Sequence, residues 1–452
     1  MLTFNYTEMK KILIVIIAVV VAFGCEIDEQ ININAPALDD ILESASKSEL
    51  NNLTAGAIAG MRNGHSIYVT ATGTITRELY LFDADPRNRT DLIGTEGSLD
   101  NNSFYTTANW TGRYRVIKNC NILLDALAVA EADVTEAEKQ GYRGFAKTIM
   151  AHQLLVLWGA YHNSGVRLEV SDPDNPGPVI TDPDAVLQAI RDMLDDGAND
   201  LSGASFAFAL SSGFQGFDTP ATFSQFNRAL AARAALYAGD MADAITHLGD
   251  SFYDINGDLT TGPKMPFSTS PGDLLNDLFK TSDQNGNQIF ASDTWVNEAM
   301  DPSDLRLNKV VQRDQAFTAS GITVNYETEL YASSISSIDI IRNEELILIY
   351  AEANIGIDNN EALAAINRIR TEAGLATYPG TYTVTVEDIL DERRYSFWCE
   401  GHRMVDLRRT GNLNESYITF DNITTTDADG NVIPADQEVF TEFPLPLTEI
   451  GS

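Results

Sequence analysis

The stretch from Ile389 to Gly411, ILDERRYSFWCEGHRMVDLRRTG, decides how the remainder of the chain is interpreted. Within 23 residues it holds four acids, five arginines, a histidine, a tryptophan and a cysteine. Acids and arginines that lie three or four positions apart are neighbours on a helix and neutralise one another. The spacing predicts three such pairs: Asp391 with Arg394, Glu400 with Arg403, and Arg403 with Asp406.

Catalysis would require a different arrangement of these groups. A general acid or base needs a carboxylate whose pKa is raised, whereas an adjacent arginine lowers the pKa and keeps the carboxylate ionised. His402 has no second histidine or cysteine at metal-ligand spacing. The stretch therefore indicates structural ion pairs, and we expect neither enzyme activity nor a cofactor.

The N-terminus has the pattern of a bacterial lipoprotein signal. Lys10 and Lys11 precede an unbroken apolar run over 12–23, which is too short to span a bilayer. The following Gly-Cys completes a sequence that resembles a lipobox, so we expect residues 1–24 to be removed and Cys25 to carry the lipid. The acidic EIDE after the cysteine is similar to signals for the outer face of a Gram-negative outer membrane. An uncleaved anchor, or cleavage at another position, is the alternative.

Composition limits both partners and cross-links. The formal net charge is -35, and such a surface repels phosphate backbones, so we expect no nucleic acid partner. Besides Cys25, the chain has only Cys120 and Cys399, and both fall inside helical patterns. We interpret them as two separate buried thiols.

Helical periodicity dominates the chain. Apolar residues recur three and four positions apart around 113–162, and Thr135 with Glu138 predicts a capping box there. The regions around 223–252 and 340–374 echo each other, each with small residues before a turn at an aspartate. This pattern is typical of tetratricopeptide-like helical hairpins and predicts an all-α fold. Two ordinary helical hairpins are the alternative.

Two regions, 60–110 and 253–335, are rich in Gly, Asn, Asp, Ser and Thr. We expect them to form long irregular loops, where a rigid scaffold usually carries its ligand-binding residues. Sugar binding needs aromatic rings for the C–H face and polar groups for the hydroxyls. The candidates for these roles are Arg77, Tyr80, Phe82, Asp83, Trp295 and Asn297. Trp295, between Asp293 and Asn297, is the candidate stacking platform, whereas Trp110 and Trp158 lie in helical patterns and are expected in the core.

Several segments together resemble the RagB/SusD family of outer-membrane lipoproteins. RNEELILIYAEA (342–353), INRIRTEAGL (366–375), the stretch that ends in EGHRMVDLRRTG (400–411) and the late FPLPLTEI (443–450) follow the family's order behind a lipobox. The positions that carry this structural signature are Arg342, Glu345, Glu352, Asn367, Arg370, Glu392, Arg393, Glu400, Gly401, Arg403 and Asp406. Ser396 and Thr410 depart from the family pattern.

The resemblance implies one helical domain over 25–452, seated on a TonB-dependent, SusC-like transporter of the outer membrane. Its implied role is to load a nutrient, most often a glycan, without catalysis. It also implies that the ions of 389–411 fix the last helices, in agreement with the charge-pair interpretation. A helical glycoside hydrolase and a helical-repeat scaffold that binds only proteins are the competing hypotheses.

A weak calcium motif lies near the C-terminus. Asp427, Asp429 and Asn431 alternate as in a calcium loop, with Glu438 eleven residues beyond Asp427. Gly430 is two positions early for that loop, and a hairpin turn explains the same letters. We therefore expect no metal ion.

Overall fold

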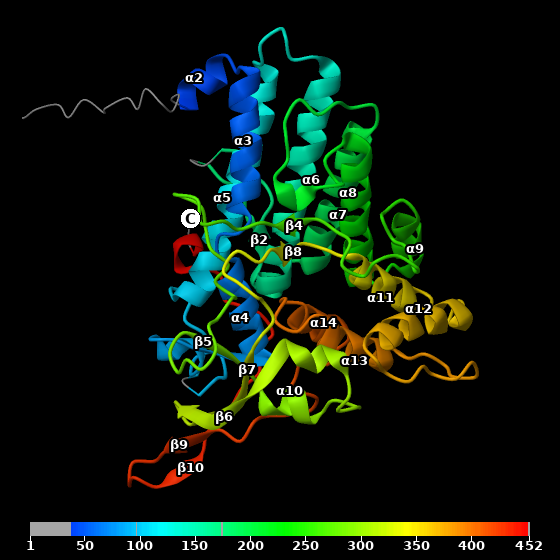
Figure 1. The fold of residues 1–452 in the computed structure, drawn as a ribbon. Helices are drawn as coiled ribbons and strands as arrows, with labels where there is room; N and C mark the ends of the chain where they lie inside the picture. The colour runs from blue at the N-terminus through cyan, green and yellow to red at the C-terminus, as the bar shows by residue number, and fades with distance from the viewer. Residues whose placement is uncertain (1–37, 96, 173–174, 451–452) are drawn as a thin grey trace, which may run out of the picture.

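The computed structural model describes residues 38–450, with the exception of residues 96 and 173–174. Figure 1 shows a mainly helical body with a small sheet at one end, so the helical prediction is confirmed in its main point. The predicted signal segment 1–24 and Cys25 lie outside the described residues. Among the described helices, none is both long and apolar enough to cross a membrane.

The first group of helices consists of α2 (Leu38–Glu43), α3 (Lys47–Gly60), α4 (His65–Ile75), α5 (Phe104–Ala128), α6 (Glu136–Tyr161), α7 (Pro183–Leu201), α8 (Pro220–Tyr237) and α9 (Met241–Gly249). In this group, α2, α3 and α4 pack on α5, and from α5 to α9 each helix packs on the next (Figure 1). The connection between α8 and α9 turns at Asp240, whose side chain caps α9. Helices joined by such short turns pack against each other because neither can bury its apolar face alone.

Helix α6 shows how local sequence sets these elements. The predicted capping box is confirmed, because the Thr135 hydroxyl accepts a hydrogen bond from the Glu138 amide and the Glu138 carboxylate accepts one from the Thr135 amide. Trp158 near its end is buried, as is Trp110 in α5, and both core assignments are confirmed. A Cβ at Gly144 would lie 2.6 Å from the Leu201 side chain, so glycine permits the close approach of α6 and α7.

The second group of helices carries the charged stretch. It consists of α10 (Asp293–Asn297), α11 (Asn343–Ala353), α12 (Asn359–Glu372), α13 (Val386–Ser396) and α14 (Arg403–Arg409). Helix α11 links the two groups, because it packs against α8 and α9 as well as against α12 and α13. Cys399 follows α13 and Cys120 lies in α5, and the two thiols are free and buried, which confirms their separate assignment.

The strands correct the all-α prediction. A four-stranded antiparallel sheet runs in the order β1 (Leu79–Phe82), β5 (Gln288–Ala291), β7 (Ile322–Thr328) and β6 (Val310–Ala319). Three two-stranded ribbons accompany it: β2 (Val166–Arg167) with β3 (Val179–Ile180), β4 (Lys264–Met265) with β8 (Ile338–Asp339), and β9 (Thr424–Thr426) with β10 (Val432–Pro434).

The sheet occupies regions that were expected to be irregular. Residues 60–110 contain α4 and β1, and residues 253–335 contain β5, β6 and β7. Strand β6 lies at the sheet edge and is exposed over most of its length, so its polar composition resembles that of a loop. An edge strand without a buried face gives no alternating pattern from which it could be recognised.

Candidate functional site

The charged stretch forms a buried network of ion pairs between helices α11 to α14. One carboxylate oxygen of Glu392 forms an ion pair with Arg370 at 2.7 Å, and the other forms one with Arg306 at 2.6 Å. Asp406 forms ion pairs with Arg393 at 2.7 Å and with Arg409 at 3.0 Å. Further pairs complete what we call the ion-pair lattice: Arg233 with Glu345, Arg342 with Glu400, and Arg409 with Glu352. Every carboxylate of the lattice therefore has an arginine beside it.

The three pairs predicted from local spacing are wrong. Glu400 pairs with Arg342, and Asp406 pairs with Arg393 and Arg409, rather than with Arg403. Arg342 and Arg393 come from other parts of the fold because α13 ends at Ser396 and the chain turns before α14 begins, whereas Arg409 lies on the same helix as Asp406. Gly401 makes that turn with φ +80°, which separates the residues that a continuous helix would have brought together.

Arginine contact keeps two carboxylates of the lattice ionised in spite of their burial. Burial alone would raise the pKa of Glu345, but the Arg233 guanidinium, 2.6 Å away, outweighs it and lowers the pKa to about 2. For Asp406, burial likewise opposes ionisation, and Arg393 and Arg409 lower the pKa to about 2. A carboxylate fixed in its charged form has no proton to donate, so Glu345 and Asp406 are unsuited to acid catalysis.

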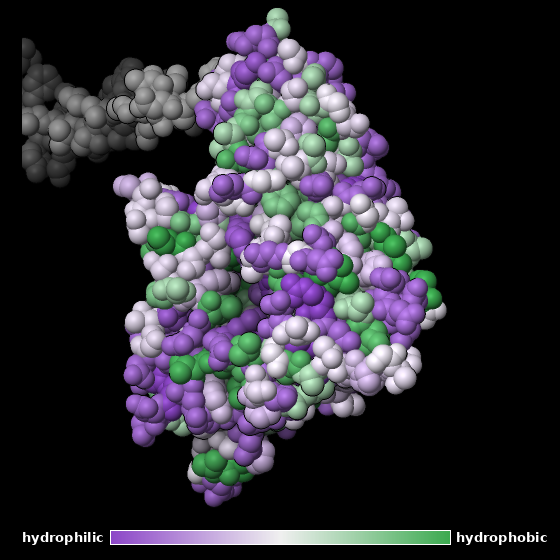
Figure 2. Space-filling model, turned by 45° about the vertical axis from the view of Figure 1, so that its right-hand side comes forward, coloured by the Kyte–Doolittle hydropathy of each residue, from purple (hydrophilic) through white to green (hydrophobic). Residues whose placement is uncertain are grey.

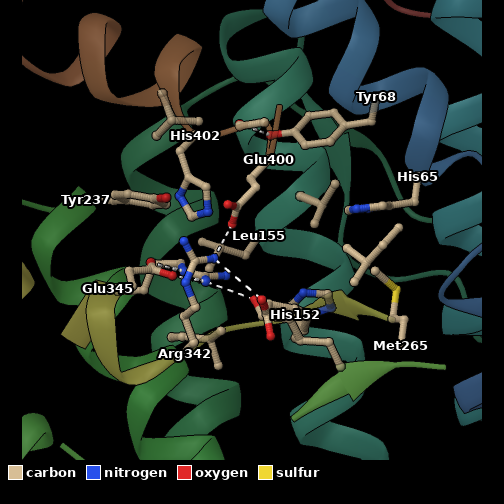
Figure 3. A pocket seen from close by; sticks show the side chains of 18 residues that line it. His65, Tyr68, His152, Leu155, Tyr237, Met265, Arg342, Glu345, Glu400 and His402 are labelled. Atoms are coloured by element: carbon tan, nitrogen blue, oxygen red, sulfur yellow. Dashed lines mark hydrogen bonds and ion pairs between the residues drawn. The ribbon is translucent and has the colours of Figure 1, made fainter. Parts of the chain in front are cut away.

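Part of the lattice lines an internal cavity (Figure 3). Glu345, Glu400 and Arg342 face three histidines across it: His65, His152 and His402. Burial lowers the pKa of His65 and His402 to about 3, so both imidazoles are neutral at physiological pH. The cavity measures about 60 Å³, room for about four water molecules. It is therefore too small for an oligosaccharide.

The predicted ring and arginine contacts for a sugar are mostly buried. Trp295 is fully buried in α10 against Tyr395 and Trp398, which corrects the prediction that it is a stacking platform. Tyr80 and Phe82 are buried in β1, so neither ring faces solvent.

Two of the polar candidates are also engaged within the fold, and one is exposed. Arg77 is buried and donates to main-chain carbonyls, including those of Thr74 and Ile93, so it too is unsuited to contact a ligand. Asp83 binds the Asp85 amide and the Asn88 side chain, whereas Asn297 is exposed.

The calcium motif is a hairpin turn. Asp427 accepts hydrogen bonds from the amides of Asp429 and Asn431, which closes the turn between β9 and β10. Glu438 lies outside this turn, and its amide donates to the carbonyl of Ile93. The hairpin alternative is therefore confirmed. In the described part of the chain no group of three or more metal-binding side chains comes together.

A polar cleft of about 260 Å³ lies where the charged stretch 389–411 meets residues of the two regions 60–110 and 253–335. Its charged residues come from the start of β1, the end of α10, helix α13 and the start of α14. They are Arg77, Glu78, Glu298, Asp391, Arg394 and Arg403, and Tyr417 and Thr419 complete the wall. The two stretches expected to bind ligand thus do meet, but through charged residues instead of the aromatic residues.

Inside the cleft, the Arg394 side chain is already engaged in ion pairs. Arg394 binds Glu78 at 3.0 Å and Glu298 at 2.8 Å, so all three groups fix one another. Burial opposes the charge of Arg394, but Glu78 and the other acids outweigh it and raise the pKa of the guanidinium. These three residues form a rigid floor.

Two other groups in the cleft retain binding capacity. Asp391 makes no hydrogen bond or ion pair within the described residues, and burial raises its pKa although Arg403 and Arg394 oppose this. Arg403 donates from one nitrogen to the Leu390 carbonyl, while its Nε lies 3.9 Å from a Glu78 oxygen and has no hydrogen-bond partner among the described residues. The Tyr417 ring lies 5.9 Å from the Arg403 guanidinium. An acceptor, a donor and a ring therefore stand side by side.

Sequence reasoning missed most of this cleft. Asp391 and Arg403 were paired with other residues, and Glu78, Glu298 and Tyr417 were not singled out at all. Asp391 lies four positions after Glu387 on α13, the residue that accepts a hydrogen bond from the Tyr417 hydroxyl at 2.7 Å. That spacing would have grouped the acids on one helix face, but nothing local indicates that 417–419 faces them.

Comparison with known proteins identifies one matching family and several structures with a similar fold. The SusD family matches residues 250–450. No curated protein matches the sequence. Among solved structures, a SusD superfamily protein from Bacteroides vulgatus ATCC 8482 is 17% identical, with a TM-score of 0.63 over 89% of this chain and 96% of that one.

Two further structures are similar over almost the whole length. Surface glycan-binding protein A from Bacteroides thetaiotaomicron is 15% identical, with a TM-score of 0.64 over 91% of this chain and 97% of that one. The same protein in complex with laminarihexaose gives a TM-score of 0.65 over 90% and 97%, at 15% identity. At these identities the likeness establishes the fold.

Proposed function

The chain is a SusD/RagB family protein through its residues 250–450, and from that premise we propose that it is a lipid-anchored surface protein that binds a neutral glycan. In this proposal the mature chain, 25–452, is one domain with tetratricopeptide-type helical pairs. It is held in the outer membrane by Cys25 and passes its ligand to a TonB-dependent, SusC-like transporter. It acts without catalysis and without a cofactor.

The presence of Asp391 and Arg403 beside Tyr417 in the cleft is the observation that carries this proposal. Sugar hydroxyls both donate and accept hydrogen bonds, so a carboxylate and a guanidinium together satisfy them, and charge-assisted bonds are the strong ones. The ring of Tyr417 offers an apolar face for the C–H side of a sugar. The cleft presents these three groups on a floor already fixed by the Arg394 ion pairs.

The charge of the cleft supports a neutral ligand. Three acids, Glu78, Glu298 and Asp391, face three arginines, Arg77, Arg394 and Arg403, so the charges of the cleft balance. The whole chain carries a net charge of -35. Sulfated or uronic-acid glycans would be repelled. Figure 2 shows one face of the molecule, on which apolar side chains are scattered among hydrophilic ones.

Isothermal titration with a panel of neutral polysaccharides and hexasaccharides, laminarihexaose among them, tests the proposal. Asp391→Asn and Arg403→Gln should each weaken binding about tenfold, because a lost hydrogen bond to a charged group costs about 1.5–3 kcal/mol. Asp429→Asn, an exposed aspartate of the β9–β10 turn, is the matched control and should bind like the parent. Binding that Asp391→Asn leaves intact would place the ligand elsewhere.

Product analysis in the same experiment tests the hydrolase alternative. The raised pKa of Asp391, near other carboxylates, is the one observation that favours it. New reducing ends would establish an enzyme, whereas bound and unaltered glycan supports the proposal. Failure of the whole panel to bind would leave the protein-binding scaffold.

The transporter is tested separately by pull-down of the full-length protein from detergent-solubilised outer membranes. Recovery of an outer-membrane barrel protein in an amount equal to that of the captured protein supports the partnership. Cys25→Ala should release the protein from the membrane fraction, and retention of that variant would contradict a lipid anchor.

A further inference from the structure

Two tyrosines and an arginine form a stacked column on the loop between α12 and α13. The Arg370 guanidinium lies 4.1 Å from the centre of the Tyr378 ring. The Tyr382 ring stacks on the other tyrosine with centroids 4.1 Å apart and planes only 5° apart. In Figure 1 this is the orange loop that projects beyond α12, outside the helical body.

The column is rigid although it stands at the surface. Both tyrosine hydroxyls donate to the same oxygen of Asp388, at 3.3 Å from Tyr378 and 2.8 Å from Tyr382. The Asn359 side chain holds the Tyr382 carbonyl at 2.8 Å, and Asn367 accepts from the Tyr378 amide at 2.7 Å. Both rings are therefore fixed before any ligand arrives, which lowers the entropic cost of stacking on them.

The two rings have different neighbours. Tyr378 covers Arg370, which also binds the Ala376 carbonyl and the buried Glu392, so its ring shields part of the lattice. Both tyrosines pack against the buried apolar cluster of α11, α12 and α13. Tyr382 is partly exposed at the outer end of the column, and the neighbours Thr381 and Thr383 are exposed on either side.

The column and the polar cleft are adjacent around one helix. Asp388, which holds the column, and Asp391, in the cleft, are three residues apart on α13 and therefore about 4.5 Å apart along its axis. Glu387 is exposed beside Asp388 and accepts the Tyr417 hydroxyl at the edge of the cleft. A continuous surface thus runs from the cleft past Glu387 to Tyr382.

We infer that Tyr382 is a second subsite, which receives the next units of an oligosaccharide whose end lies in the polar cleft. This inference rests on the proposed glycan-binding function and makes the ligand class an oligosaccharide rather than a mono- or disaccharide. One sugar occupies Asp391, Arg403 and Tyr417, and the chain continues over Glu387 so that a later unit stacks on the outer face of Tyr382.

Length-dependent binding tests the inference. The probes are di- and hexasaccharides of the laminari, cello, malto, manno and xylo series, titrated calorimetrically into the folded protein. Tyr382→Ala should weaken hexasaccharide binding about three- to tenfold, the magnitude of a ring contact, and leave disaccharide binding unchanged. Tyr382→Phe keeps the ring and should retain most of the hexasaccharide affinity.

Tyr350→Ala is the matched control. Tyr350 is also partly exposed and stacked, on Tyr253 at 4.8 Å, but it lies on α11 and its hydroxyl donates to Glu361 of α12 and not to Asp388. The Tyr350→Ala variant should bind the disaccharides and the hexasaccharides like the parent protein. Equal loss for short and long probes in Tyr382→Ala, or no loss, would overturn the inference.

The two proposals fail in distinguishable ways. If hexasaccharide binding is weakened by Asp391→Asn but unchanged by Tyr382→Ala, the second subsite is refuted and the proposed function stands. A parent protein that binds none of the probes removes both.

Discussion

Replacement of Gly401 by alanine tests how tightly the lattice is packed. Gly401 has φ +80°, and an added Cβ would lie 2.6 Å from the Tyr68 ring, whose hydroxyl donates to the Gly401 carbonyl at 3.0 Å. The left-handed backbone costs a non-glycine residue about 1–2 kcal/mol. Overpacking in a filled interior adds about 1–3 kcal/mol. The expected loss in the free energy of unfolding is therefore about 2–5 kcal/mol.

Urea unfolding followed by circular dichroism measures this loss, and Gly411→Ala is the control. Gly411 has φ +76°, but a Cβ there would meet no atom within 4 Å, so only the backbone cost of about 1–2 kcal/mol applies. In the double variant with Tyr68→Ala the steric part of the Gly401→Ala cost should vanish, as a coupling of about 1–3 kcal/mol. If Gly401→Ala and Gly411→Ala destabilise equally, the tight packing deduced for this turn is refuted.

Three further predictions concern the same interior. Glu345→Gln leaves the buried Arg233 without its carboxylate, so urea unfolding should show a loss of about 3–5 kcal/mol, and a loss below about 1 kcal/mol would contradict a buried pair. Burial lowers the pKa of His402 from 6.5 to about 3, so the unfolded chain binds more protons between these values. His402 alone should therefore contribute a loss of stability of about 1.4 kcal/mol per pH unit on acidification below 6.5, and His402→Gln should make the fall of the melting temperature with acidification less steep by that share. Trp295→Ala should destabilise by about 3–5 kcal/mol while the folded fraction keeps its glycan affinity, and selective loss of affinity would restore its predicted binding role.

The helical body could be predicted from the sequence because its signals are local. The capping box at Thr135 and the turn at Asp240 depend only on neighbouring residues, and the structure shows both. The sheet could not be predicted in this way. Strand β1 pairs with β5 more than two hundred residues later, and the exposed strand β6 has no apolar face to reveal its period.

The candidate site shows the same limit. The charged composition of 389–411 correctly indicated ion pairs, but the partners lie far away in sequence: Arg409 meets Glu352, 57 residues earlier, and Arg394 meets Glu78, 316 residues earlier. Trp295 resembles an exposed loop aromatic because Asp and Asn surround it. Its single-turn helix points the ring inward, which only the packing of Tyr395 and Trp398 determines.

The separation of these partners also imposes an order on folding. Arg77 donates to the carbonyl of Glu438, 361 residues further along the chain. A polypeptide synthesised from its N-terminus cannot close that contact, or the one between Arg394 and Glu78, until nearly all of it has emerged. Such high contact order slows folding and leaves unpaired strand edges open to aggregation. We therefore expect the nascent chain to be most prone to aggregation before its last segments arrive.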